Sequence, residues 1–302
     1  MHPKNPHIDG YDMQALAKAS PALKSHIIES KHGRETINFS NVNAVKALNQ
    51  ALLVCHYDLD YWDIPKGHLC PPIPGRADYL LGLNDALISH NSKFNLDVSA
   101  INALDIGTGA NLIYPIIGQS LLNWNWVGSD IDLGSINHGQ SIVDKNSGMA
   151  DKIHLRHQSN SDHIFTGIVQ SDDYFNVTCC NPPFHKSAEE ALAGSVRKNK
   201  NLAKNKSKRN SNVKHTSSNQ HLNFEGQSNE LWCKGGELAF IKTMISESRN
   251  VAEQVGLFSC LVSKKDSLPA IAAALRSSKV SEFEVHEMQQ GSKVSRFITW
   301  CY

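Results

Sequence analysis

The sequence lacks the features that mark membrane, exported and metal-bound proteins. No stretch approaches the roughly 18 uninterrupted apolar residues of a membrane-spanning helix, and residues 1–20 contain no apolar leader segment. The seven cysteines form no C-x-x-C pair, and the fifteen histidines show no paired metal-ligand spacing. We therefore expect a globular cytoplasmic protein with reduced thiols, without a bound metal or membrane contact, and monomeric.

Acidic residues are absent from one basic stretch. Residues 197–214 hold eight of the 30 Lys and Arg and no Asp or Glu, so the rest of the chain carries 22 basic and 29 acidic residues. This stretch lies within an Asn- and Ser-rich segment, 194–228, that reads as a flexible loop insertion. The loop is either a solvated surface or an RNA contact. The candidate RNA-binding residues are Arg197, Lys198, Lys200, Lys204, Lys206, Lys208 and Arg209.

Apolar runs alternate with helix-like segments from residue 101 onward, as a parallel α/β sheet requires. A turn around Gly291 near the end predicts an antiparallel strand pair that completes the sheet. The expected strands are 101–106, 124–129, 152–156, 174–180, 257–262, 282–287 and 297–302, and the expected helices are 110–120, 136–146, 237–252 and 268–277. We therefore expect a mostly parallel α/β domain over residues 96–302.

The first 95 residues have a different pattern. Apolar residues at helical spacing predict helices over 42–55 and 78–90, and three prolines (71, 72 and 74) are expected to break the chain between them. Nothing in this part suggests a strand-rich module. We expect a helical accessory region, 1–95, that packs on the α/β domain.

A glycine-containing turn follows the first predicted strand of the domain. In Asp105-Ile-Gly107-Thr108-Gly109 the glycines let the backbone approach a ligand, although the third glycine of G-x-G-x-x-G is replaced by Leu112. Asp130 lies 23 residues after Gly107, where a carboxylate can accept hydrogen bonds from ribose hydroxyls. Asp132 is a second candidate, and either acid could instead cap the next helix. A nicotinamide cofactor and S-adenosylmethionine fit this pattern equally well.

The sequence Asn181-Pro182-Pro183-Phe184 separates these two cofactors. Prolines lack an N–H donor and fix φ, so this segment leaves the fourth predicted strand as a rigid extended corner. The Asn181 side-chain oxygen and the Pro182 carbonyl can accept both hydrogens of an amino group and direct its lone pair at a methyl group. Phe184 can stack on the attached ring. The segment favours methyl transfer to the nitrogen of a planar amine.

These motifs resemble those of class I S-adenosylmethionine-dependent methyltransferases, which have a Rossmann-like fold. Along nearly its whole length the chain resembles the bacterial 23S ribosomal RNA (adenine-1618-N6)-methyltransferase family, RlmF, and its eukaryotic relatives, the methyltransferase-like-sixteen RNA adenine methylases. The resemblance is carried by INFSNVNAVKALNQALL (37–53), IPKGHLCPPIPGRADYL (64–80), GTGANLIYPIIG (107–118), NPPFHKS (181–187) and GGELAFIKTMISES (235–248).

The resemblance implies roles for individual residues. Asp105, Gly107, Thr108 and Gly109 would line the methionyl end of S-adenosylmethionine, and Asp130 would bind its ribose. Arg76 would bind the methionine carboxylate, whereas without the resemblance it would pass for a surface arginine. Asn160 aligns loosely with an adenine-contacting position, and the N-terminal region and the basic loop would contact RNA. Glu237 could support the site or cap a helix.

The expected function is transfer of a methyl group to N6 of adenine 1618 in 23S ribosomal RNA, either free or in a large-subunit assembly intermediate. The asparagine-proline-proline-aromatic corner also serves enzymes that methylate DNA adenine or protein glutamine, so the motif alone predicts the reaction and not the substrate. The same fold would also suit a non-catalytic RNA-binding assembly factor or a nicotinamide-dependent dehydrogenase.

Overall fold

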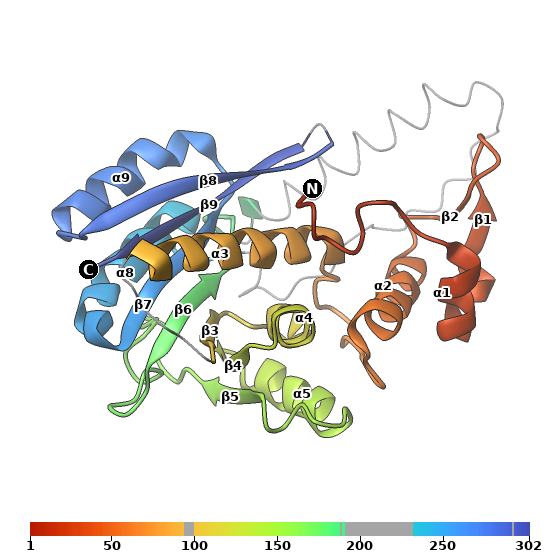
Figure 1. Ribbon diagram of the computed structural model, residues 1–302, viewed down its shortest axis with the longest axis horizontal. Helices are drawn as coiled ribbons and strands as arrows, with labels where there is room; N and C mark the ends of the chain where they lie inside the picture. Colours follow the sequence, from red (N-terminus) through yellow and green to blue (C-terminus); the bar gives the residue numbers. More distant parts are fainter. Residues whose placement is uncertain (94–99, 188, 191–231, 292) are drawn as a thin grey trace.

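The computed structural model describes residues 1–93, 100–187, 189–190, 232–291 and 293–302. The seven candidate RNA-binding residues of the basic stretch, Arg197 to Arg209, lie outside this part of the chain. A seven-stranded sheet with the strand order β5-β4-β3-β6-β7-β9-β8 forms the centre of the molecule (Figure 1).

The sheet is mostly parallel, as the sequence predicts. Its parallel strands are β3 (Asn102–Ile106), β4 (Asn125–Asp130), β5 (Ile153–His157), β6 (Phe175–Cys180) and β7 (Val255–Val262). Strand β9 (Lys293–Cys301) runs antiparallel to both β7 and β8 (Glu282–Gln290), and the β8–β9 turn contains Gly291. The predicted antiparallel last strand is therefore confirmed.

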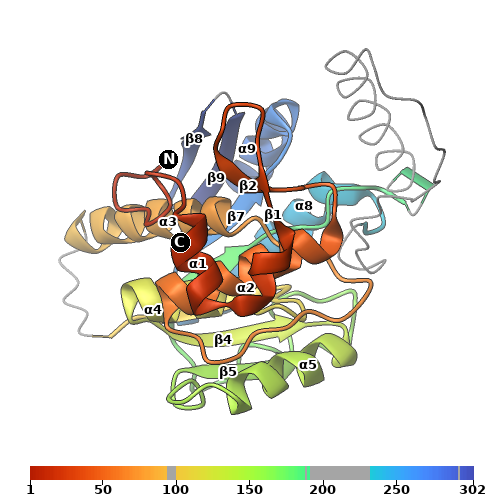
Figure 2. The same cartoon turned by 90° about the vertical axis from the view of Figure 1, so that its right-hand side faces the viewer.

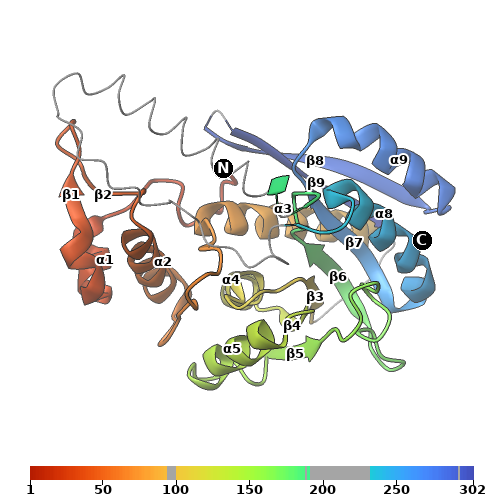
Figure 3. The ribbon, with the colours of Figure 1, turned by 180° about the vertical axis from the view of Figure 1, so that it is seen from behind.

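Two hydrophobic clusters cover the two faces of the sheet, because successive strand residues point to opposite sides. One cluster contains Ala103, Trp126 and Val177 together with residues of α2 (Val42–Tyr57), α3 (Ile73–Lys93), α4 (Ile113–Leu122) and α5 (Leu133–Asp144). The other contains Leu104 and Val127 with residues of α8 (Gly236–Ser248) and α9 (Leu268–Ser277), which Figure 3 shows from behind. Trp124, Trp126 and Trp300 are buried in these clusters, whereas Trp232 is half-buried.

The predicted long helix over 237–252 is shorter in the structure. Helix α8 ends at Ser248 and is followed by the 3-10 segment η2, Arg249–Gln254. Val251 leaves the helical region at φ −120°, and β7 already begins at Val255. The apolar residues keep a helical spacing from α8 into the 3-10 segment, so the spacing alone did not show where the α-helix ends.

The N-terminal region is mostly helical but also contains strands. It holds α1 (Met13–Ala19), the 3-10 segment η1 (Pro21–His26), an antiparallel hairpin of β1 (Ile27–Glu29) and β2 (Glu35–Ile37), and then α2 and α3. Figure 2 views the molecule from the side on which α1, α2 and the hairpin lie. The hairpin was not predicted, because its strands of three residues are too short for a periodic signal.

Helix α3 begins earlier than the sequence predicted. Pro74 lies in its first turn, where a helix needs no N–H donor, so this proline starts the helix and does not break it. Helix α3 packs on the sheet: Gly82 of α3 faces the Phe297 ring, and Tyr79 hydrogen-bonds Ser259 of β7 at 2.7 Å. One cluster therefore joins the N-terminal region to the α/β domain.

Candidate functional site

The predicted site residues follow directly after neighbouring parallel strands. Gly107 follows β3, Asp130 ends β4 and Asn181 follows β6. From β3 the chain continues to β4 and β5 on one side of the sheet, and from β6 it continues to β7 on the other side. The direction in which successive strands are added therefore reverses between the neighbours β3 and β6. In open α/β sheets, ligands bind at the carboxyl ends of the strands beside such a reversal.

The glycine turn after β3 has the geometry that close ligand approach requires. Gly107 and Gly109 adopt left-handed conformations with φ of 74° and 65°, and a side chain built at Gly107 would meet no atom within 4 Å. The backbone N–H groups of Gly107 and Thr108 both donate to the Ser129 carbonyl at 2.9 Å. Leu112, at the position of the missing third glycine, is also left-handed, with φ of 49°.

Asp130 and Asp132 accept hydrogen bonds from different parts of the chain. The Asp130 carboxylate accepts the N–H of Gly109 at 2.9 Å and that of Asp132 at 2.9 Å, so it fixes the glycine turn to the end of β4. Burial raises the pKa of Asp130. Asp132 accepts the N–H and the hydroxyl of Ser135 and caps α5. The helix-cap interpretation is therefore correct for Asp132, and Asp130 is the acid at the strand end.

The buried Asp105 and the half-buried Arg76 act on one another electrostatically, because the Arg76 charge lowers the pKa of Asp105. Asp105 is fully buried, the Cys179 thiol donates to its Oδ1 at 3.4 Å, and burial raises its pKa to about 7. Arg76 Nη1 donates to the Tyr114 hydroxyl at 2.8 Å, with the guanidinium 5.4 Å from the centre of that ring. Arg76 is thus not an ordinary surface arginine. Sequence reasoning missed Tyr114, for which only its place after the glycine turn could have been a signal.

The Asn-Pro-Pro-Phe corner begins where the fully buried strand β6 ends. The Asn181 Oδ1 atom is shielded from solvent and has no hydrogen-bond partner among the described residues. Pro182 is buried, whereas Pro183 and Phe184 are half-buried. An unpaired shielded acceptor is costly unless a donor reaches it, so the geometry suits an amino group as the partner of Asn181.

The chain after this corner packs against the start of α8. His185 pairs with Trp232 in a parallel β-bridge, and the Cys233 N–H donates to the His185 carbonyl at 3.1 Å. Glu237, in the first turn of α8, accepts the N–H of Ser263 at 2.6 Å. Ser263 follows β7 directly. Glu237 therefore links its helix to a strand end and does not cap the helix.

Asn160 makes only local hydrogen bonds in the described structure. It lies exposed after β5, where its Oδ1 accepts the Asp162 N–H at 3.0 Å and its own N–H donates to Gln158 at 3.0 Å. This arrangement is an Asx turn, which explains the residue without a ligand. The position at the carboxyl edge leaves the predicted adenine contact as a hypothesis.

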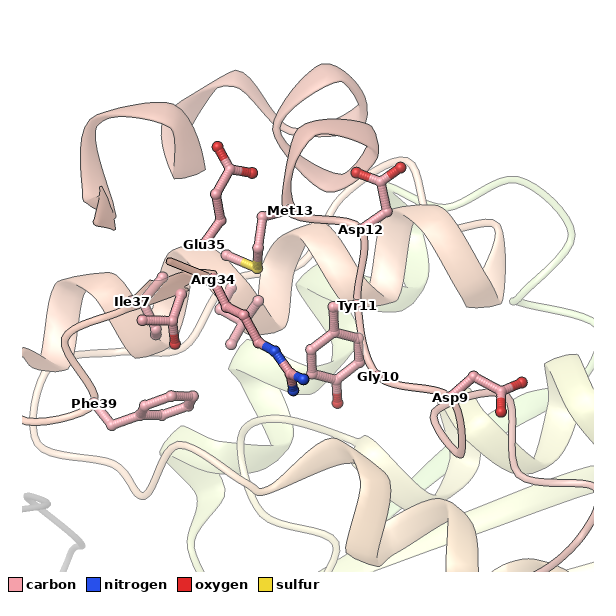
Figure 4. Close-up of a pocket in the computed structure, with 11 residues that line it drawn as sticks. Asp9, Gly10, Tyr11, Asp12, Met13, Arg34, Glu35, Ile37 and Phe39 are labelled. Carbon is pink, nitrogen blue, oxygen red and sulfur yellow. The ribbon is translucent and has the colours of Figure 1, made fainter. Parts of the chain in front are cut away.

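A cavity of about 470 Å³ lies in the N-terminal region, between residues 9–13 and strand β2 (Figure 4). Its floor includes the buried Met13, Ile37 and Leu48. Its lining also includes the exposed Arg34 and Phe39, and Phe39 is 61% exposed (Figure 4). Exposed aromatic and arginine side chains beside an apolar floor are a surface on which a base can stack.

Two other features are absent from the part of the chain that the structure describes. No group of three His, Cys, Asp or Glu there could hold a metal ion. Within the same residues, none of the helices combines the length and the apolar character needed to cross a membrane.

Comparison with known proteins identifies the family. A family model described as RNA methyltransferase matches residues 1–302. The chain is 49% identical to the ribosomal RNA large subunit methyltransferase F of Pseudoalteromonas atlantica, covering 99% of this chain and 91% of that protein. It is 47% identical to the protein of the same name from Colwellia psychrerythraea, covering 100% and 99%.

Solved structures agree with the fold. The hMettl16 catalytic domain in complex with MAT2A 3′UTR hairpin 1 matches with a TM-score of 0.78 and 29% identity, covering 100% of this chain and 95% of that one. The N-terminal domain of human METTL16 in complex with SAH matches in fold, with a TM-score of 0.75 at 24% identity, covering 100% and 98%. The glycine turn, the asparagine-proline-proline-phenylalanine corner and the full-length match agree: the chain belongs to the RNA methyltransferase family.

Proposed function

We propose that this protein transfers a methyl group from S-adenosylmethionine to N6 of one adenine, adenine 1618, in 23S ribosomal RNA. The observation that carries the proposal is the shielded Asn181 Oδ1 after β6, which has no hydrogen-bond partner among the described residues and lies one strand away from the glycine turn. The name shared by the relatives supports ribosomal RNA as the substrate. The reaction then takes place in the cytoplasm, where bacterial ribosomes are made.

The residues at the strand ends suit S-adenosylmethionine, whose sulfonium supplies an activated methyl group. Arg76 keeps a shielded Nε without a described partner, and a guanidinium suits a carboxylate. Asp105 likewise keeps an unpaired shielded Oδ2, and its carboxylate suits an ammonium group. Asp130 would accept from the ribose hydroxyls. Thr108, whose shielded hydroxyl faces Asp105 and lowers its pKa, would complete the methionyl end with Gly107 and Gly109.

The corner residues would orient the amine. Asn181 Oδ1 and the Pro182 carbonyl accept its two hydrogens, so the lone pair is freed from the ring and directed at the methyl group. Phe184 stacks on the base, and Pro183 keeps the corner extended. Because the leaving thioether is neutral, the amine proton can pass to water after the transfer, and positioning supplies most of the rate enhancement.

The substrate is an RNA whose phosphates need basic partners. The neighbour in complex with a 3′UTR hairpin matches 100% of this chain, so the match includes the N-terminal region. In this protein the N-terminal region would contribute Arg34 and Phe39, and the basic stretch 197–214 would neutralise phosphates. If so, deletion of that stretch flattens the salt dependence of RNA affinity and leaves cofactor affinity unchanged. A salt slope equal to that of the full chain would contradict its role.

The test of the chemistry is Asn181→Ala. We expect at least about a 100-fold loss of methylation rate with unchanged affinity for S-adenosylhomocysteine, because one positioned acceptor contributes several kcal/mol at the transition state. Asn250→Ala serves as the control, since Asn250 is exposed in η2, which precedes the amino end of β7 and lies away from the carboxyl edge of the sheet. Turnover at the wild-type rate in Asn181→Ala would refute the mechanism.

The test of the substrate is mass spectrometry of ribosomal RNA from a deletion strain. Loss of one N6-methyladenosine from the 23S RNA, restored by the gene, is expected. Unchanged RNA with an unmethylated glutamine in a release factor would favour a protein-glutamine methyltransferase instead. Assays on naked 23S RNA and on partly assembled subunits show which of them the enzyme accepts.

A further inference from the structure

Several shielded polar atoms without a partner gather at the carboxyl edge of the sheet. In the described part of the chain they include atoms of Arg76, Asp105, Thr108 and Asn181, to which the proposed function gives partners. Three more belong to residues without an assigned partner: the donors Trp232 Nε1 and Arg296 Nε, the latter paired in the sheet with Val262 at the carboxyl end of β7, and the single acceptor Glu237 Oε2. A shielded carboxylate oxygen without a donor destabilises a fold, so folding alone gives no reason for it.

Only one of the two Glu237 carboxylate oxygens has a hydrogen-bond partner in the described structure. The side chain is 3% exposed, and its Oε1 accepts the N–H of Ser263 at 2.6 Å. A glutamine could make the same bond through its single oxygen without burying a charge. The second carboxylate oxygen, Oε2, therefore calls for a donor from outside the described structure.

Trp232 and Glu237 flank the Asn-Pro-Pro-Phe corner. Trp232 pairs with His185, the residue directly after Phe184. Strands β6 and β7 pair in parallel, so their carboxyl ends lie at the same edge of the sheet, where Asn181 directly follows β6 and Ser263 directly follows β7. Because Glu237 is bonded to Ser263, its carboxylate lies beside the corner.

Two glycines hold the start of α8 close to this corner. Gly235 and Gly236 are left-handed, with φ of 83° and 72°. A side chain at Gly236 would lie 2.8 Å from Lys186 Cγ and 3.5 Å from the His185 carbonyl carbon. Only glycine permits this approach, so the first turn of α8 stays at a set distance from residues 185 and 186.

We propose that Glu237 Oε2 and Trp232 Nε1 bind the ribose 2′-hydroxyl of the target nucleotide. The inference rests on the proposed function. Asn181 and Pro182 already accept both hydrogens of the adenine amine, which is the only donor on that base. Within a strand, the remaining donor of the nucleotide is its 2′-hydroxyl. That group also accepts, so it can donate to Glu237 and accept from Trp232, and it distinguishes RNA from DNA.

The experiment compares two substrates and three proteins. The substrates are a 23S RNA fragment that contains the target adenosine and the same fragment with a single 2′-deoxyadenosine there. The proteins are wild type, Glu237→Gln and Trp232→Phe. Glu237→Gln retains the acceptor for Ser263 and replaces only the free oxygen by an amide NH₂, so melting temperature and S-adenosylhomocysteine affinity should stay at wild-type values.

We expect the wild type to lose about 10- to 100-fold in kcat/KM on the deoxy substrate, the range for a hydrogen bond to a charged group. Glu237→Gln should lose about as much on the ribose substrate and little more on the deoxy substrate, because the contact is already gone. Trp232→Phe should show the same pattern with a smaller loss.

Two results would overturn the inference while the proposed function stands. One is a wild type that methylates both fragments equally, and the other is a pair of variants that remain as sensitive to the deoxy substitution as the wild type. If Glu237→Gln unfolds, the kcat/KM values of Trp232→Phe on the two substrates still test the inference. A wild type that methylates neither the fragment nor 23S RNA, bare or partly assembled, refutes the proposed function, and the inference with it.

Discussion

Asp105→Asn tests how the buried carboxyl beneath the glycine turn links stability to cofactor binding. Burial raises its pKa from 3.8 to about 7, against the lowering effects of the Thr108 and Cys179 side chains. Among the charged groups that act on it, Asp130 raises this pKa and Arg76 lowers it. Asparagine has nearly the same shape and remains neutral at every pH, so it mimics the protonated acid.

The sign of the effect follows from proton linkage. Between pH 3.8 and about 7 the folded chain holds a proton that the unfolded chain has released. The stability contributed by this carboxyl is therefore complete below pH 3.8 and is lost as the pH rises to about 7. At about 1.4 kcal/mol per pH unit the full loss is about 4 kcal/mol. With an unfolding entropy of about 2 cal/mol/K per residue, it corresponds to about 6 °C in Tm.

The assay is thermal unfolding of both proteins from pH 4 to pH 8. We expect equal Tm values near pH 4 and an Asp105→Asn variant that is about 6 °C more stable at pH 8. Other titrating groups act equally in both proteins, so the difference between them isolates Asp105. A second measurement is calorimetric titration with S-adenosylhomocysteine, whose ammonium group favours the charged carboxylate. Wild-type affinity should rise from pH 6 to pH 8, and that of the variant should stay flat.

A Tm difference that does not change with pH would refute the raised pKa. A wild-type affinity that is as flat with pH as that of the variant would refute the pairing of Asp105 with the cofactor, even if the stability result holds. The two measurements therefore separate the electrostatics of the fold from the role of the carboxyl in binding.

Three further changes have expected outcomes. Gly118→Ala should lower stability by about 1–3 kcal/mol in urea denaturation, because the new methyl group clashes with the buried Trp126 indole, and unchanged stability would contradict that packing. The Glu247 carboxylate accepts the N–H groups of Ile164 and Phe165 at 2.9 and 2.8 Å. Burial raises the pKa of Glu247, but its hydrogen bonds lower that pKa by more, so the pKa lies below its usual value. Glu247→Gln should thus cost about 1–2 kcal/mol at pH 7 and less as the pH falls through that pKa, whereas a pH-independent loss would show that charge is not involved. Phe39→Ala should weaken RNA binding by about 1–3 kcal/mol with unchanged Tm, and an unchanged Kd would exclude stacking on this exposed ring.

The elements of the sheet could be predicted because their signals are local. Strands β6 and β7 are largely apolar runs, whereas β5 reads IHLRH and has only two apolar residues. Proline at the corner restricts the backbone, and glycine at the turn gives it special freedom, so both mark strand ends in the sequence. The antiparallel end of the sheet was visible from two strand patterns around Gly291. Elements without periodicity were missed: the β1–β2 hairpin has three residues in each strand, and the start of α3 was hidden by Pro74.

The division of labour between Asp130 and Asp132 shows where local reasoning ends. Both acids follow the same strand two residues apart, and either could cap a helix or bind a ligand. Only the folded chain shows Asp132 on Ser135 and Asp130 on the glycine turn. The choice depends on the course of the backbone between the two residues, which side-chain chemistry does not determine.

By itself the sequence determined the fold class, the order of the motifs and the reaction, because strand patterns, glycines and prolines act on the chain within a few residues. The tertiary structure decided which polar groups meet. It placed Arg76 on Tyr114 across 38 residues of sequence and Glu237 on Ser263 across 26. It also left Asn181 Oδ1 and Glu237 Oε2 shielded without a described partner. These two acceptors lack a donor only because packing has excluded the water that would otherwise bind them.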